Sequence, residues 1–375
     1  MGIWRAYMIS VAVAVITGSL AGLALQFELW TPELTTSPAF YTTMLGGHGL
    51  WLSASVGAPA VGGICGYLLV PRLVHLRRER ATMLAWMGLA TWIGGLIIGL
   101  YVVISPDEWA GSPDWRLMVV RGLFASSGGI TAIHLGILVG LNRPKALTID
   151  SVCAVGFVAA IAAAAVCAVP APAIAFDFSI VAAAIAITAA LVRDAAWRPP
   201  VAVVIAGILG IAWWTHAGGP GFVLAALMWI WLAVGKGWSR PAAVYTLVGI
   251  IPALAVASIA SATTATFLDD TYFHVGRAHL VFAAVAFAIF GTTAPRTKLA
   301  SIGAATLCLG LIAHAIIELW LGGRGMPRRY VAYEPMFVDG FRAAGVAAVV
   351  AVGGLVVVSA AMISSRSWLV RTSSS

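Results

Sequence analysis

The chain has 375 residues, of which 61% are hydrophobic and only 10% charged, with a formal net charge of +8 and a mean hydropathy of +0.98. So few charges exclude a soluble globular domain of this length and indicate a polytopic membrane protein. In such a protein the positive charge reports orientation rather than nucleic-acid binding, so we expect no nucleic-acid partner. The cysteines lie in apolar segments without metal or disulfide spacing, and we expect buried small hydrophobic side chains at Cys65, Cys153, Cys167 and Cys308.

Apolar stretches long enough to cross a bilayer recur along the whole chain. They predict an all-α, polytopic membrane helical bundle of about twelve transmembrane helices, forming a single domain over residues 1–375. No small-residue cleavage site precedes Glu28, so the first stretch is expected to be a retained helix. The expected spans are 5–27, 42–71, 82–104, 119–141, 149–169, 174–193, 199–216, 220–237, 242–262, 272–292, 298–320 and 339–363.

The charges in the connecting loops predict the orientation, because Lys and Arg are retained on the cytoplasmic side. Basic loops all fall on one side, which we assign to the cytoplasm together with both termini, in a bacterial-type inner membrane. These loops carry Arg72, Arg77, Arg78, Arg80, Arg143, Lys145, Arg193, Arg198, Lys236, Arg240, Arg296 and Lys298. The opposite loops carry Glu28, Glu33, Asp107, Glu108, Asp114, Asp177, Asp269 and Asp270.

Two histidines lie at matched depth in spans that run in the same direction. His48 in span two and His279 in span ten each lie about seven residues, or roughly 10 Å, beneath the outer surface. An ionisable side chain at such depth is a functional-site candidate. Matched depth on two helices is what axial ligation of one heme iron requires, so we expect His48 and His279 to bind a heme. Taken singly, each is more often a hydrogen-bonded residue between helices.

The residues around these histidines extend the prediction. Gly46, Gly47 and Gly49 remove side chains where a flat macrocycle would approach the backbone. The outer loop GGRGMPRRYVAYEP breaks the charge pattern with Arg324, Arg328 and Arg329. Arginine binds carboxylates bidentately, so heme propionates are candidate partners; a solvated charge cluster is the alternative.

The other histidines are weaker candidates. His75 lies in a basic loop, and His274 falls on a different face of its helix from His279. His134 is most simply an interhelical hydrogen-bonding group, and His314 is most simply the same, with Glu318 as an i,i+4 partner.

Three motifs resemble subunit I of the heme-copper oxidases in order and spacing: GHGLWL around His48, DTYFHVGRAHLVFAAVAFAIFG in span ten, and GMPRRY from Gly325 to Tyr330. The resemblance covers most of the chain, although spans five to eight match poorly. It implies that His48 and His279 ligate a low-spin heme and that Arg328 and Arg329 bind its propionates.

The departures from the family are informative. The family has a histidine for the high-spin heme where this chain has Arg277, which cannot act as an ordinary iron ligand. The copper-ligating histidine of the sixth helix has no counterpart in FDFSIVAAAIAITAALV, and WWTHAGGPG keeps at best His216, followed by Ala217. A copper site needs about three nitrogen ligands, so we expect no copper. Gln26 replaces an arginine that contacts the heme formyl group in many members, which favours heme b over heme a.

These features predict a membrane electron-transfer subunit of a respiratory-type oxidoreductase complex that carries one bis-histidine low-spin heme and lacks the oxygen-reducing heme-copper centre. Such a chain is expected to be a cytochrome subunit rather than a catalytic oxidase. Its expected partners are an extracytoplasmic electron-transfer subunit, a cytochrome c or a cupredoxin-like protein, with other membrane subunits. Two alternatives stay open: a terminal oxidase or nitric oxide reductase with a reorganised centre built on His216 and His274, and a non-redox assembly or sensing protein.

Overall fold

A computed structural model describes residues 2–30, 37–74, 76, 83–104, 115–142, 148–194, 200–217, 219–234, 240–262, 268, 270–327 and 333–364. Within these ranges the chain is helical, with one isolated β-bridge between Thr271 and Pro327. The helices are α1 (Ile3–Glu28), α2 (Pro38–Val56), α3 (Ala58–Val61), η1 (Gly62–Gly66), α4 (Tyr67–Leu73), α5 (Met83–Ile104), α6 (Trp115–Leu141), α7 (Ile149–Cys167), α8 (Pro172–Asp194), α9 (Val201–Ala217), α10 (Gly219–Val234), α11 (Pro241–Val244), η3 (Tyr245–Ile250), α12 (Ile251–Ala262), α13 (Tyr272–Thr293), α14 (Lys298–Gly323), η5 (Pro335–Phe337) and α15 (Val338–Ser364).

The helical membrane architecture agrees with the composition. Among the described residues, nine helices are long and apolar enough to cross a membrane. The other three expected spans contain shorter apolar helices, Pro59–Leu73, Val201–Thr215 and Gly221–Val234. The chain is therefore a polytopic helical membrane protein, while the count of twelve spans and the single domain stay predictions.

The expected span 42–71 is not one continuous α-helix. α2 ends at Val56, Gly57 is extended, and the chain resumes as α3, the π-helix η1 and α4. A π-helical turn shifts the register of the side chains that follow it. Here the π-turn lets Gly63 approach α1 so closely that a Cβ atom on Gly63 would lie 2.2 Å from the ring of Tyr7. The π-turn and this close contact with α1 therefore occur at the same place in the chain.

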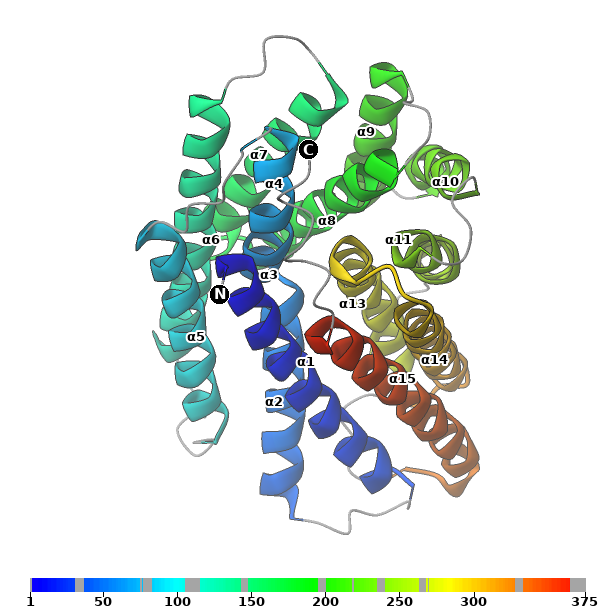
Figure 1. The fold of residues 1–375 in the computed structure, drawn as a ribbon. Helices are drawn as coiled ribbons and strands as arrows, with labels where there is room; N and C mark the ends of the chain where they lie inside the picture. Colours follow the sequence, from blue (N-terminus) through cyan, green and yellow to red (C-terminus); the bar gives the residue numbers. More distant parts are fainter. Residues whose placement is uncertain are drawn as a thin grey trace.

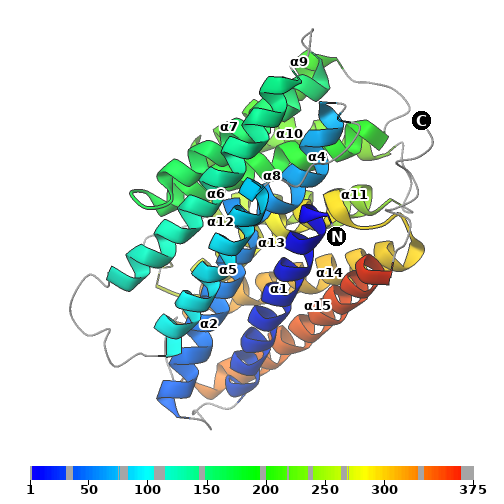
Figure 2. The same ribbon diagram turned by 60° about the vertical axis from the view of Figure 1, so that its left-hand side comes forward.

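Five helices surround the site described below. α1 packs between α2 and α15, and α14 packs between α13 and α15 (Figure 1). The view in Figure 2 shows the same neighbours, with α1 and α15 antiparallel. α1 begins and α15 ends at the same end of the bundle, while the location of both termini on one side of a membrane stays a prediction. Which side this is stays a prediction.

The helices pack through small and apolar side chains. One large core cluster includes the fully buried Trp92, Trp229 and Phe287. The cysteines are free thiols, three of them buried and Cys167 partly exposed, as expected for small hydrophobic residues. A smaller cluster joins the C-terminal ends of α1 and α14 to the N-terminal ends of α2, α13 and α15, and consists of Leu25, Leu29, Tyr41, Tyr272, Leu321, Met326, Phe337 and Phe341.

Candidate heme-binding site

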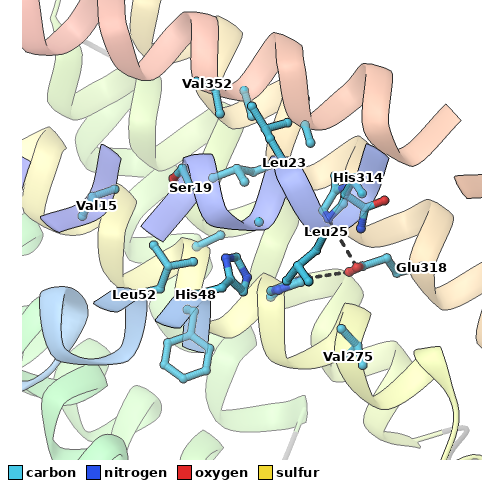
Figure 3. Close-up of a pocket in the computed structure, with 18 of the residues that line it drawn as sticks. Val15, Ser19, Leu23, Leu25, His48, Leu52, Val275, His314, Glu318 and Val352 are labelled. Carbon is cyan, nitrogen blue, oxygen red and sulfur yellow. Dashed lines mark hydrogen bonds and ion pairs between the residues drawn. The ribbon is translucent and has the colours of Figure 1, made fainter. Parts of the chain in front are cut away.

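A largely apolar cavity lies among α1, α2, α13, α14 and α15. The cavity and its open mouth together occupy about 1220 Å³. Leucine, valine, alanine and phenylalanine side chains form most of its wall, and Figure 3 shows His48, His314 and Glu318 among the residues that line it. A large apolar cavity with a few convergent polar groups is the usual form of a cofactor site. The residues with polar side chains at the wall are Ser19, Gln26, Tyr41, His48, Tyr272, His279, His314 and Glu318.

His48 reaches this cavity from α2 and is held against α1. Its Nδ1 atom lies 2.8 Å from the carbonyl oxygen of Gly18. A carbonyl oxygen only accepts hydrogen bonds, so Nδ1 is the protonated nitrogen, and Nε2 carries the lone pair of a neutral ring. Gly22, one turn further along α1, provides the space, because a Cβ atom there would lie 2.6 Å from the His48 ring. The backbone of α1 therefore sets both the tautomer and the position of His48.

His279 reaches the same cavity from α13 and is held against α14. Its Nδ1 atom lies 2.5 Å from Oε2 of Glu318, a residue with a side-chain exposure of only 1%. Donation from Nδ1 to the carboxylate leaves Nε2 with its lone pair. Among the described residues, Nε2 of His279 has no hydrogen-bond partner, and the same holds for Nε2 of His48.

The structure brings the two histidines of matched depth together. Their ring centres lie 5.9 Å apart and their planes are inclined at 85°. Two imidazoles that share one metal ion have ring centres about 6 Å apart, because each metal–nitrogen bond is about 2 Å long. Both rings also have the second nitrogen hydrogen-bonded, as metal-ligating histidines usually do. The geometry therefore suits two axial ligands of a single iron.

His314 and Glu318 form the i,i+4 pair expected from the sequence. Nε2 of His314 lies 3.3 Å from Oε1 of Glu318, and its Nδ1 lies 2.9 Å from the carbonyl oxygen of Ala344 in α15. The sequence did not reveal that the other oxygen of Glu318 contacts His279. Ligand atoms of His279, His314 and Glu318 lie within 4.8 Å of one another, so their donor set also suits a small metal ion.

The glycines next to His48 do not serve the role expected from the sequence. A Cβ atom on Gly46 would lie 3.3 Å from Val103 of α5, one on Gly49 would meet open space, and none of Gly46, Gly47 and Gly49 lines the cavity. Because successive residues of a helix point in different directions, the orientation that directs His48 toward α1 directs these glycines away from the cavity. The glycine that allows close approach at the site is Gly22, on a different helix.

Two other histidines, His134 and His274, lie outside the cavity wall. Nδ1 of His134 lies 3.2 Å from the hydroxyl of Tyr67 in α4, so His134 is the interhelical hydrogen-bonding group that was expected. His274 does not line the cavity; its Nδ1 lies 3.4 Å from a guanidinium nitrogen of Arg277.

Some residues singled out in the sequence fall outside the structural description. Arg328 and Arg329, expected to bind propionates, lie outside the described residues, as do His75 and Lys236. The side chain of His216 is also outside the description.

Gln26 adds a polar group to the cavity wall. It lies on α1, is buried, and its Oε1 atom has no hydrogen-bond partner among the described residues. A buried amide oxygen without a partner costs about 1–3 kcal/mol. Such a group is suited to a polar substituent or a water molecule inside the cavity.

A second, much smaller space lies among α8, α9, α10, α12 and α13 and measures about 250 Å³. Its described walls are apolar, and they come from Ile180, Ala183, Ala184, Ile187, Ile211, Trp229, Ile250, Leu254, Ala284, Val285 and Ala288. Trp229 donates from Nε1 to Oγ1 of Thr188 at 2.9 Å, so its polar atom is satisfied within the core. This part of the bundle is packed by side chains.

The comparisons with known proteins give one partial relative. No family model matches the chain. A 92-residue stretch is 37% identical to cytochrome c oxidase polypeptide 1 of Halobacterium salinarum. The matched stretch covers 22% of this chain and 16% of that protein. The matched stretch is thus well under two thirds of the relative's length. The similarity supports a relationship to the heme-copper oxidases, and the membrane bundle fits a protein of membrane oxidoreductase type.

Proposed function

We propose that this chain is a membrane electron-transfer subunit that binds one low-spin heme through His48 and His279. The observation that carries the proposal is the pair of imidazole rings 5.9 Å apart, each with Nδ1 hydrogen-bonded and Nε2 free among the described residues. A bound heme supplies a one-electron couple, and with both axial positions filled it has no open position for a gas ligand.

Three further features of the described residues fit a heme. The cavity is large and apolar, as the macrocycle requires. The absence of a side chain at Gly22 leaves space for the His48 ring. Gln26 presents a buried, unpartnered oxygen at the wall. Gln26 stands where many oxidases have an arginine that contacts the heme formyl group, and on that basis we propose heme b rather than heme a.

The hydrogen-bond pattern favours heme over a small ion at His279, His314 and Glu318. A metal ion held there through Nδ1 of His279 would take that atom away from Glu318, and it would not use the approach of the His48 and His279 rings, whose centres lie 5.9 Å apart. A heme held through Nε2 of His48 and Nε2 of His279 would use the free nitrogens and would keep the hydrogen bonds that these two histidines and Glu318 make among the described residues.

The packing of the second space supports the loss of the oxygen-reducing centre. The resemblance to oxidases implies that this centre would use residues of spans six, seven and ten, which correspond to α8, α9 and α13. The described walls there are alanine, isoleucine, leucine, valine and tryptophan, which offer no metal-ligating atoms. We therefore propose a chain without copper and without catalytic oxygen or nitric oxide reduction. Steady consumption of either gas by the purified chain with a reduced donor would contradict this.

A heme at this depth would exchange electrons with a partner on the outer side. We propose a cytochrome c, a cupredoxin-like protein or an extracytoplasmic subunit as that partner, together with other membrane subunits. The tagged chain should recover such a redox protein from native membranes under mild detergent. Recovery of the chain alone would argue against an obligate complex.

The direct test of heme ligation is the replacement of His279 by alanine. The variant should lose the low-spin heme spectrum of the wild-type protein, because one axial nitrogen is removed. His134→Ala is a matched control, since His134 is buried and hydrogen-bonded in α6 but does not line the cavity. A low-spin spectrum that is unchanged in His279→Ala would rule out the proposal.

A further inference from the structure

We infer that Glu318 is a positioning residue that sets the electron-donor strength of His279, and that His314 acts on His279 through Glu318. The inference rests on the proposed function, because it assigns roles to residues that act through a proposed heme ligand. Neither residue belongs to the motifs by which the chain resembles the oxidases.

A continuous polar connection crosses three helices. It begins at the backbone carbonyl of Ala344 in α15, passes through His314 and Glu318 in α14, and ends at His279 in α13. The carbonyl of Ala344 accepts only, so Nδ1 of His314 is protonated and Nε2 is directed at Glu318. The orientation of the His314 ring is therefore fixed by the backbone of α15, which lies outside the His314–Glu318 pair.

Glu318 is placed where a carboxyl group is costly. It is 1% exposed and lies near the C-terminal end of the apolar helix α14. Removing a charge from water destabilises a fold unless the charge is paired and hydrogen-bonded, and a well-packed apolar pair is often as stable. Each oxygen of Glu318 has its own imidazole partner, His279 for Oε2 and His314 for Oε1. An ionised carboxylate accepts at both oxygens: Oε2 accepts from Nδ1 of His279, and Oε1 accepts from Nε2 of His314 when the His314 ring carries a proton on both nitrogens.

A carboxylate on Nδ1 affects the ligand in two ways. It fixes the ring plane and the tautomer of His279, and it increases the electron density on Nε2. A more basic ligand stabilises ferric heme relative to ferrous heme, so the carboxylate lowers the midpoint potential. The effect on His48 is weaker, because its Nδ1 donates to a neutral backbone carbonyl rather than to a carboxylate. The two axial ligands of one iron would thus differ in donor strength, with His279 the stronger.

The test is a redox titration of the purified protein, followed at the reduced heme band, for wild type, Glu318→Gln, His314→Gln and the double variant. Glutamine keeps an oxygen that accepts from His279 but removes the charge, so a purely structural role would leave the potential unchanged. We expect Glu318→Gln to increase the ferrous-to-ferric ratio at a fixed potential about tenfold, which corresponds to about 59 mV for a one-electron couple. His134→Gln is the matched control and should retain the wild-type potential.

The double variant distinguishes a relay from two separate effects. Because the polar connection of His314 to His279 runs through Glu318, the shift caused by His314→Gln should vanish in the Glu318→Gln background. A wild-type potential in Glu318→Gln would overturn the role of Glu318 and leave the proposed heme ligation standing. If the Glu318→Gln protein fails to retain heme, the midpoint potential of the His314→Gln protein is the test. A changed potential in that protein supports the relay, and a wild-type potential overturns it. A wild-type protein without low-spin heme would overturn both proposals.

Discussion

The imidazole rings of His48 and His279, on helices that are far apart in the sequence, lie with their centres 5.9 Å apart and their planes at 85°. Each ring is held from behind, His48 by the Gly18 carbonyl of α1 and His279 by the Glu318 carboxylate of α14. Both rings are therefore positioned by neighbouring helices rather than by each other.

Replacement of His48 by alanine should convert the heme from six-coordinate to five-coordinate. The remaining ligand, His279, keeps its bond to Glu318, so we expect heme to be retained in part. The open iron position should bind carbon monoxide, which is measured as a shift of the reduced absorption band. The same experiment on His134→Ala should show no carbon monoxide shift. A His48→Ala protein with an unchanged, carbon monoxide-insensitive band would show that His48 is not a ligand.

Gly22→Ala should disturb the heme without disturbing the helix. Alanine is favoured over glycine in a helix by roughly 0.5–1 kcal/mol, but the new Cβ atom would lie 2.6 Å from the His48 ring. We expect loss of the low-spin signal or a lower heme-to-protein ratio, measured by the pyridine hemochrome assay. Gly129→Ala is the control, because a Cβ atom there has no neighbour within 4 Å. Equal spectra for the two variants would contradict the position assigned to His48.

Thr188→Val should destabilise the packed region around Trp229 without changing the heme. Valine fills the same space but removes the acceptor of the Trp229 Nε1 proton. The unpaired buried N–H should cost about 1–3 kcal/mol, which lowers the thermal unfolding midpoint followed by circular dichroism in detergent. Thr91→Val is the comparison, because the Thr91 hydroxyl donates only to its own helix. A heme spectrum altered in Thr188→Val would speak against a purely structural role for this region.

Double replacement of Arg328 and Arg329 by glutamine should weaken heme retention. The resemblance to oxidases assigns these residues to the propionates, and guanidinium–carboxylate pairs are strong hydrogen-bonded contacts. The heme-to-protein ratio after extended dialysis should fall, while the reduced band of the remaining heme stays low-spin. Arg342→Gln is the control, since Arg342 is exposed and pairs with Asp339 at 3.5 Å. Equal retention by the wild-type and doubly substituted proteins would remove the two arginines from the site.

The location of most helices could be predicted from hydropathy, because a helix that must cross hydrocarbon needs a long apolar run. The span expected at 82–104 is the helix Met83–Ile104. Gly57 and Pro59 are sequence signals for the break after Val56, because proline disfavours the helical conformation of the residue before it. The contact of Gly63 with Tyr7 could not be predicted, since it comes from tertiary packing.

The proximity of His48 and His279 could be predicted, because equal depth on two helices follows from counting residues. The contact between Glu318 and His279 could not. It depends on how α14 is rotated against α13, which periodicity does not specify when apolar residues surround the whole helix. The closeness of Gly22 to His48 likewise depends on how α1 and α2 pack together.

The most direct measurement is the absorption spectrum of the purified protein, oxidised and dithionite-reduced, with and without carbon monoxide. Ligation by His48 and His279 predicts a sharp reduced low-spin b-type band that carbon monoxide does not move. A carbon monoxide-dependent shift would show an open iron position and contradict a heme closed by these two histidines.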